Sequence, residues 1–175
     1  IIGGLPGQKG AWILVEGAVL EQIQPFRQRE HDAPESGGIL LGYRRDAHLH
    51  VVEATIPGQE DRGTRISFRR SANGHREQAL AGWHRSDRTL DHVGEWHTHP
   101  EQSPSPSGPD YRASSALLAA RSGQPLLFLI LGIETHLLLG FGLVHMSTGA
   151  ANAPVSDPYI HRSAEPVPLV SASLP

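Results

Sequence analysis

The chain has 175 residues, a formal net charge of −3 at pH 7 and an isoelectric point near 6.4. This length suits one domain with a normal core, and the weak negative charge gives no overall attraction to nucleic acid or to an anionic membrane. The absence of cysteine excludes disulfides, thiolate metal sites and a thiol nucleophile, and so excludes the cysteine proteases.

The first half of the chain predicts one helix followed by short strands. Residues Glu16–Arg29 have apolar side chains at helical spacing, and Pro25 is expected to kink or shorten this helix. Gly38–Tyr43 and His48–Thr55 are apolar segments on either side of a polar turn, which is typical of a β-hairpin. Arg65–Phe68 is predicted as a further short strand.

The region that follows predicts a helix over Asn73–Arg85 and then a strand over Asp91–Trp96. The helix is expected to turn three apolar side chains toward the core: Ala79, Leu80 and Trp83. The strand runs directly into a polar loop, so its end is expected at the surface.

A helix predicted over Ser107–Arg121 has the clearest boundaries in the sequence. Ser107 and Asp110 have the S-x-x-D spacing of a capping box, in which each side chain binds a backbone N–H of the first turn. Pro109 suits the first turn, and Gly123 suits the end of the helix. Because capping alone accounts for Ser107 and Asp110, this pair by itself does not indicate a metal site.

Two apolar strands, Pro125–Ile133 and His136–Met146, are predicted to complete the sheet. Neither reaches the length of about 20 apolar residues that crosses a bilayer. We therefore expect residues 1–146 to form one α/β domain, a sandwich of sheet and helices, and the Pro/Ser/Ala-rich residues 147–175 to form a tail. Residues 1–10 do not have the pattern of a signal peptide, so we expect a cytoplasmic protein.

A set of metal-ligating residue types follows the strand predicted over Asp91–Trp96. Alternate side chains of an extended segment point to the same side, so His97 and His99 can bind one ion. Asp110 follows in the first turn of a helix, where a carboxylate is electrostatically favoured. Two histidines and one carboxylate form the ligand set of a catalytic zinc, which keeps a fourth position for water.

A second pair of histidines has the same spacing. His48 and His50 are followed by Glu53, but no helix start with a carboxylate comes after them. Since the chain has 11 histidines, such a pair also arises by chance. A polar strand face is therefore the interpretation we favour for this pair.

The candidate ligands resemble those of the JAMM (JAB/MPN) metalloprotease family, in its prokaryotic JAB branch. The family motif is a glutamate far upstream, then His-x-His, seven residues, serine, two residues and aspartate. The matching residues are His97, His99, Ser107 and Asp110. The segment Glu35–Gly42 resembles the family's glutamate segment, and the likeness covers about residues 16–146. It implies a cytidine-deaminase-like mixed β-sheet flanked by helices.

The resemblance also implies a role for each matching residue. His97, His99 and Asp110 would hold one Zn²⁺, which lowers the pKa of bound water to about 7. Glu35 would accept a proton from that water and pass it to the leaving amine. The hydroxyl of Ser107 would stabilise the oxyanion of the tetrahedral intermediate.

Residues beside the motif leave one alternative open. Glu95 alternates onto the same face as the two histidines and could be the base in place of Glu35, whereas Glu101 is expected at the surface. Trp96 and Thr98 are expected to face away from the metal and to pack in the core.

By family analogy, the resemblance implies a peptidase or isopeptidase that cleaves after the C-terminus of a ubiquitin-like protein or its conjugate. Members of this branch are often encoded beside E1-like and E2-like proteins, including in antiphage operons of the CBASS type. The bound tail would lie extended in a groove beside the metal, where strand addition to a sheet edge can hold it.

Three other functions stay open at this point. They are a RadC-like protein associated with DNA, an MPN scaffold without catalysis, and a hydrolase of a small amide or carrier tail. Seven arginines lie between Arg62 and Arg88, against Glu77 and Asp87, and could meet an acidic partner, although a solvated face is the interpretation we favour. We expect no nucleic-acid or membrane partner, and the oligomeric state is open.

Overall fold

The computed structural model describes residues 2–4, 10–122 and 124–141. Its main sheet contains, in spatial order, β1 (Ile2–Gly4), β2 (Trp12–Val15), β4 (His48–Ala54), β3 (Gly37–Arg45), β7 (Asp91–Thr98), β8 (Leu126–Leu131) and β9 (His136–Phe141). A separate hairpin contains β5 (Arg62–Thr64) and β6 (Ser67–Arg69). The α-helices of these residues are α1 (Gly17–Ile23), α2 (Ala72–Arg85) and α3 (Gly108–Ala120). The predicted tail at 147–175, the end of the last predicted strand and Gly123 lie outside the described residues.

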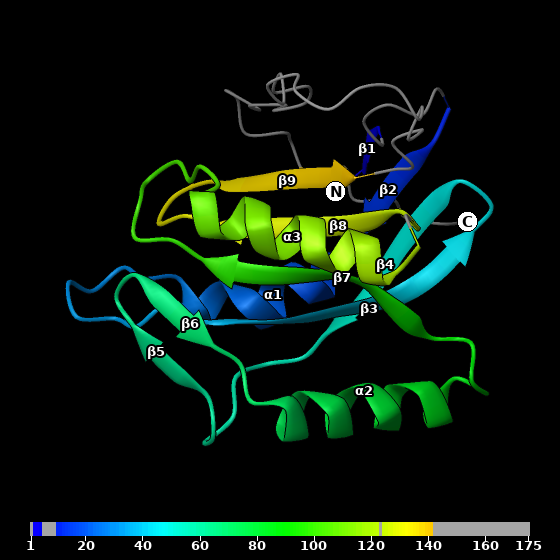
Figure 1. The fold of residues 1–175 in the computed structure, drawn as a ribbon, viewed down its shortest axis with the longest axis horizontal. Helices are drawn as coiled ribbons and strands as arrows, with labels where there is room; N and C mark the ends of the chain where they lie inside the picture. The colour runs from blue at the N-terminus through cyan, green and yellow to red at the C-terminus, as the bar shows by residue number, and fades with distance from the viewer. Residues whose placement is uncertain (1, 5–9, 123, 142–175) are drawn as a thin grey trace.

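The main sheet is mixed and has helices on both faces. β2 pairs in parallel with β4, and β7 with β8, while the other neighbours are antiparallel. Figure 1 shows α1 and α3 on opposite sides of the central strands, with α2 along the lower margin of the sheet. This arrangement confirms the predicted α/β class with a mixed sheet flanked by helices.

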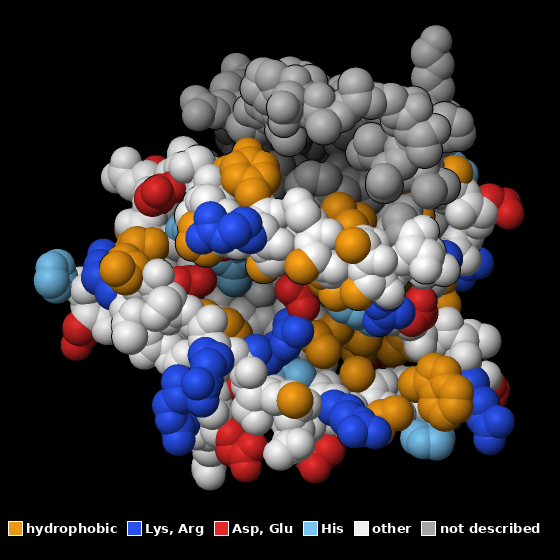
Figure 2. All heavy atoms as spheres, viewed as in Figure 1, with side chains coloured by type: hydrophobic (Ala, Val, Ile, Leu, Met, Phe, Trp, Pro, Cys, Tyr) orange, Lys and Arg blue, Asp and Glu red, His pale blue; other side chains and the backbone are white. Residues whose placement is uncertain are grey.

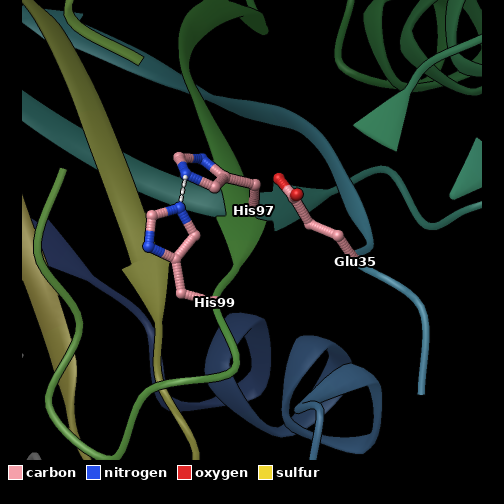
Figure 3. Close-up of side chains that lie close together, drawn as sticks. All are labelled: Glu35, His97 and His99. Carbon is pink, nitrogen blue, oxygen red and sulfur yellow. Dashed lines mark hydrogen bonds between the residues drawn. The ribbon is translucent and has the colours of Figure 1, made fainter. Parts of the chain in front are cut away.

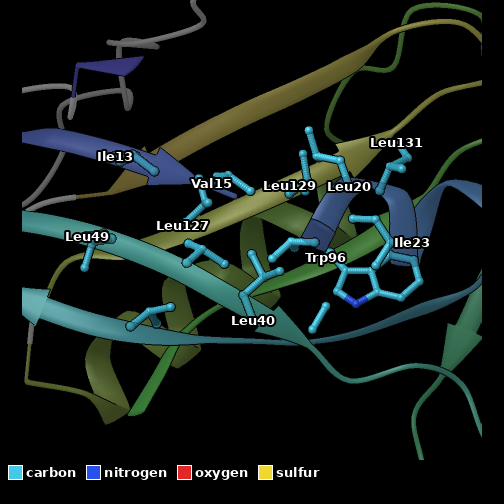
Figure 4. Close-up of a cluster of buried hydrophobic side chains, with 14 of the residues drawn as sticks. Ile13, Val15, Leu20, Ile23, Leu40, Leu49, Trp96, Leu127, Leu129 and Leu131 are labelled. Carbon is cyan, nitrogen blue, oxygen red and sulfur yellow. The ribbon is translucent and has the colours of Figure 1, made fainter. Parts of the chain in front are cut away.

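The strand β8 shows how the two faces share the core. All six of its residues are buried, as expected for a strand covered on both sides. Three of them join the larger cluster beneath α1: Leu127, Leu129 and Leu131 (Figure 4). The three that alternate with them form a smaller cluster against α3: Leu126, Phe128 and Ile130.

Several predicted elements are confirmed. β3 and β4 form the predicted hairpin, whose turn contains Asp46 at a φ of 53°. β7 begins at Asp91 as predicted and continues through His97. The cap of α3 is Ser107, and both hydrogen bonds of the predicted capping box are present.

Two predicted elements differ from the structure. The helix predicted to reach Arg29 ends at Ile23, because Pro25 has no N–H to donate and lies in the short 3₁₀ turn η1 (Gln24–Phe26). The short strand predicted over Arg65–Phe68 is present with shifted bounds: β6 begins at Ser67, and Arg65 lies in the turn between β5 and β6.

The predicted core contacts of α2 are also wrong. Its buried residues are His75 and Gly82, whereas Leu80 is 44% exposed and Trp83 is only half-buried. The apolar spacing placed these side chains correctly on one helix face, but no described segment covers that face fully. No helix in the described ranges combines the length and the apolar character needed to span a bilayer.

Candidate metal centre

His97 and His99 lie where the central strand β7 leaves the sheet. The backbone N–H of His99 donates to the carbonyl of Leu131 at 2.8 Å, which holds this exit against β8. The alternation of an extended chain turns both imidazoles to the same side. Their Nε2 atoms are 3.0 Å apart (Figure 3).

Asp110 reaches the two imidazoles from the first turn of α3. Its Oδ2 accepts from the backbone N–H of Ser107 at 2.6 Å and from the Ser107 hydroxyl at 2.7 Å. Its Oδ1 lies 3.5 Å from Nε2 of His97, and its Oδ2 lies 3.3 Å from Nε2 of His99. The capping box and the contacts with the histidines therefore coexist in one carboxylate.

These three residues fit a metal ion. Ligand atoms placed about 2.0–2.1 Å from a tetrahedral ion are about 3.3–3.4 Å from one another. The imidazole nitrogens are 3.0 Å apart, and the two oxygens of Asp110 lie 3.5 Å from His97 and 3.3 Å from His99, which is close to the spacing that such an ion requires. Two nitrogens and one oxygen also suit zinc better than Mg²⁺ or Ca²⁺, which prefer oxygen ligands.

Glu35 comes to this site from the segment before β3. The pairing of Gly37 with His97 places the residues just before β3 beside the end of β7. The backbone N–H of Glu35 donates to Thr64 of β5 at 2.7 Å, and a Cβ at Gly63 would collide with the Glu35 carbonyl. Figure 3 shows the carboxylate directed toward the imidazoles. One ligand atom each from Glu35, His97 and His99 lies within 4.8 Å of the others.

The two carboxylates have opposite pKa shifts. Burial raises the pKa of Glu35 above its ordinary value, against the attraction of His97 and His99. Burial would also raise the pKa of Asp110, but hydrogen bonds with His97 and His99 outweigh it and hold that pKa well below its usual range. The site therefore combines a carboxylate that stays charged with one that takes up a proton more readily.

The residues next to the two histidines in β7 face the core, as predicted. Trp96 is buried, and its indole N–H donates to the carbonyl of Thr55 at 3.0 Å. Thr98 is also buried, and its hydroxyl accepts from the N–H of Ser36 at 3.0 Å. Both residues fix the strand that presents the histidines.

The alternative base and the surface glutamate have other partners. Glu95 points into the same cleft, but its Oε1 is held by Arg70 Nη2 at 2.6 Å. Glu101 is exposed and accepts from the backbone N–H of Ser105 at 2.9 Å. Arg70 and Phe68 line the cleft, which has a volume of about 260 Å³, and neither was singled out in the sequence. Only the fold of the β5–β6 hairpin brings them there.

The second pair of histidines does not converge on a common point. Nδ1 of His48 accepts from the backbone N–H of Trp12 at 3.1 Å, whereas Nε2 of His50 lies 2.9 Å from Glu16. Glu53 is paired with Arg85 at 2.8 Å. Separate partners suit the polar strand face that we favoured for this pair.

Comparison with known proteins identifies similar sequences. Residues 18–141 match the family described as prokaryotic homologs of the JAB domain. A protein from Pseudomonas aeruginosa named "CD-NTase/cGAS isopeptidase" is 40% identical over 66% of this chain and 73% of its own length. One from Vibrio cholerae with the same name is 35% identical over 69% and 76%. The "Probable metalloprotease y4qB" of Sinorhizobium fredii is 32% identical over 69% and 76%.

Proposed function

We propose that this chain, which belongs to the prokaryotic JAB family, is a metal-dependent hydrolase of isopeptide or peptide bonds in protein conjugates. The observation that carries the proposal is the convergence of His97, His99 and Asp110, with Glu35 beside them. The isopeptidase and metalloprotease names of relatives at 32–40% identity support a hydrolase.

His97, His99 and Asp110 would hold the ion, for which we propose zinc. When bound, such an ion polarises a carbonyl oxygen and lowers the pKa of a water molecule that it binds. The lowered pKa of Asp110 keeps its carboxylate charged, which suits a ligand. The hydrogen bond from the backbone N–H of Ser107 fixes the Asp110 carboxylate independently of an ion.

Glu35 would move the proton during hydrolysis. Its carboxylate accepts a proton from the attacking water as the new C–O bond forms, and it returns that proton to the amine nitrogen as the C–N bond breaks. The raised pKa of Glu35 suits both steps, because it makes the carboxylate a stronger base toward the water, and the acid form can still donate to the departing amine.

Ser107 has a structural contact and a proposed catalytic one. In the structure its hydroxyl donates to Asp110 at 2.7 Å. Stabilisation of an oxyanion would require this hydroxyl to turn from the carboxylate toward the substrate. The role implied by the family stays a prediction.

The names of the relatives suggest the substrate. Two of them connect an isopeptidase with CD-NTase/cGAS, so we propose a conjugate in which a protein of that kind supplies the carboxyl side of the bond. A ubiquitin-like tail, the setting of antiphage defence and a cytoplasmic location remain predictions of the same proposal.

The competing functions make different demands on the site. A scaffold without catalysis needs no convergent ligands, and the convergence of His97, His99 and Asp110 with Glu35 beside them favours an enzyme. A RadC-like association with DNA would give binding that weakens steeply with salt, which a filter-binding titration measures.

The decisive variant is Glu35→Gln, with Glu101→Gln as a matched control at the surface. The substrate is a CD-NTase/cGAS-type protein joined through its C-terminal carboxyl to a lysine of a reporter protein. We expect kcat to fall by about 10²–10⁴-fold in Glu35→Gln while zinc content by elemental analysis stays stoichiometric. Glu101→Gln should match the wild type. Undiminished turnover in Glu35→Gln would reassign the base, and no turnover in the wild type would favour a scaffold.

A further inference from the structure

A second hollow adjoins the catalytic cleft. It has a volume of about 470 Å³ and lies between α2 and the strands β3 and β7, and we call it the α2 groove. Arg70 lines both the α2 groove and the cleft that contains His97, so the two are neighbours. Figure 2 shows apolar side chains gathered between α3 and α2, with Lys and Arg side chains beside them.

The walls of the α2 groove are largely apolar. They include Leu41 and Ile39 of β3, and the three α2 side chains that the sequence places on one helix face: Ala79, Leu80 and Trp83. Leu80 remains 44% exposed, although its spacing is typical of a core residue. When another chain covers apolar surface of this kind, the free energy of the system falls.

The rim of the α2 groove carries excess positive charge. Arg70, Arg76 and Arg121 line it, against the single acidic residue Asp91. Arg70 is neutralised by Glu95. Arg76 has no ion pair among the described residues, and Asp91 lies 3.8 Å from Arg121.

Asp91 cannot neutralise Arg121 fully, because it also binds Arg44. The Arg44 Nε is 3.2 Å from the carboxylate, closer than any nitrogen of Arg121. The rim therefore keeps a net positive charge, which favours an acidic ligand.

His92 lines the α2 groove and holds Arg121 beside it. Its Nδ1 accepts from Arg121 at 2.7 Å, and because an arginine only donates, the ring proton lies on Nε2. Burial and the neighbouring Arg121 lower the pKa of His92, which keeps the ring neutral. Nε2 is buried and lies near the backbone of Gly94, which acts to raise the pKa of the ring, so the role of His92 is to hold Arg121 in the wall of the groove.

We propose that the α2 groove binds a segment of the protein substrate that carries a carboxylate among apolar side chains. This inference rests on the proposed function, since the segment would flank the bond held in the cleft. The apolar walls bury the segment's side chains, and Arg76 and Arg121 attract its carboxylate. A nucleic acid would satisfy the arginines but leave the apolar walls unfilled.

Peptide selection tests the ligand chemistry without catalysis. The bait is the full chain with Glu35→Gln, loaded with zinc, and the probe is a random 12-residue peptide library displayed on phage. A bait that also carries Arg76→Glu and Leu80→Asp removes peptides that bind elsewhere. We expect the enriched peptides to combine Asp or Glu with Leu, Ile or Phe. Enrichment of basic peptides, or of none, would overturn the proposal.

Affinity measurements with a synthetic fluorescent copy of an enriched peptide locate the site. Arg76→Glu and Leu80→Asp change exposed positions, and each should weaken binding at least tenfold by fluorescence anisotropy. The matched control is Arg45→Glu, whose side chain lies over Tyr43 and lines neither hollow, and it should stay within twofold. Equal binding to all the variants would contradict the proposal. So would competition by a single-stranded oligonucleotide, or a dimer of this chain that dissociates in the groove variants.

Kinetics separate this inference from the proposed function. On the conjugate substrate, Arg76→Glu should raise KM at least fivefold and leave kcat within twofold, because the groove acts on binding and not on the reacting atoms. An unchanged KM with normal turnover would refute the groove and leave the hydrolase intact. Absence of turnover in the wild type would refute the hydrolase, while the peptide affinities still decide the groove.

Discussion

Among the described residues, histidine meets aspartate in two clusters, and these differ in how their polar atoms are used. In the catalytic cleft, the Nε2 atoms of His97 and His99 lie 3.0 Å apart and face the same carboxylate of Asp110. Under α2, the buried cluster Thr55–His75–Asp61 forms a line: His75 Nε2 lies 3.0 Å from Asp61, and its Nδ1 lies 2.6 Å from Thr55.

The buried cluster is saturated by the protein itself. Asp61 also accepts the N–H groups of Gly58 and Ser71, at 2.7 and 2.6 Å, and Thr55 accepts the N–H of Ile39 at 2.8 Å. Each acceptor has its donor, so these residues hold α2 to the sheet and offer no position for an ion. In the cleft, the Nε2 atoms of His97 and His99 and the carboxylate of Asp110 face one another, so all three residues can direct a lone pair to one point. Convergence, and not residue type, distinguishes the proposed metal site from the structural cluster.

The largest expected difference between the clusters is in metal binding. His99→Ala should raise the zinc dissociation constant by well over 100-fold, since even partners of ligands cost about 10–100-fold when removed. It should also abolish turnover. Competition with a chromophoric chelator measures the affinity, and His75→Ala, at a histidine outside the cleft, is the comparison. Zinc binding that survives in His99→Ala would break the assignment of the ligands.

The hydroxyl of Ser107 contacts the proposed ligand Asp110 and also caps α3. Ser107→Ala should lower kcat by about 10²-fold if this hydroxyl stabilises an oxyanion, and should lower the free energy of unfolding by about 1 kcal/mol through loss of the cap. Ser107→Thr retains the hydroxyl and should preserve both. A loss of stability with an unchanged kcat would leave Ser107 with the capping role alone.

The buried cluster should respond in stability and not in chemistry. Asp61→Asn should lower the free energy of unfolding by about 2 kcal/mol. The NH₂ group of asparagine would face N–H groups to which the carboxylate now accepts hydrogen bonds. Urea unfolding measures this difference, and zinc affinity should be unchanged. Burial would raise the pKa of Asp61, but its hydrogen bonds with Ser71, Gly58 and His75 lower it.

The lowered pKa of Asp61 gives this prediction a pH dependence. A carboxyl whose folded pKa is depressed stabilises the protein above its unfolded pKa, and this contribution is lost as the pH falls toward the folded pKa. The wild type should therefore lose stability on acidification more steeply than Asp61→Asn. Parallel stability curves for the two proteins would show that the carboxylate contributes nothing.

The smallest expected effect concerns the acid limb of activity. Glu35 must be deprotonated to act as a base, so kcat/KM should fall about tenfold per pH unit below its pKa. Because burial raises that pKa, the fall should begin at a higher pH than for an ordinary glutamate. The pKa of His99 is also raised, because the effect of Asp110 outweighs that of burial, which would lower it. Zinc content must therefore be measured at each pH. An acid limb in the ordinary glutamate range, with zinc retained, would contradict the role of Glu35.

Local sequence alone determined the parts of the site that lie close together in the chain. Alternation along an extended strand was enough to place His97 and His99 on one side and to send Trp96 into the core. The capping box of Ser107 and Asp110 was readable because its hydrogen bonds lie within four residues. These predictions depend on backbone geometry, which a short segment specifies by itself.

Only the tertiary structure decided the rest. Glu35 reaches the imidazoles through the pairing of Gly37 with His97, and pattern in the sequence does not fix the register of strands so far apart. Likewise, the spacing of Leu80 and Trp83 defined an apolar helix face, but whether that face joins the core depends on how far α2 stands from the sheet. Periodicity indicates which side of an element is apolar, but only the packing determines what covers that side.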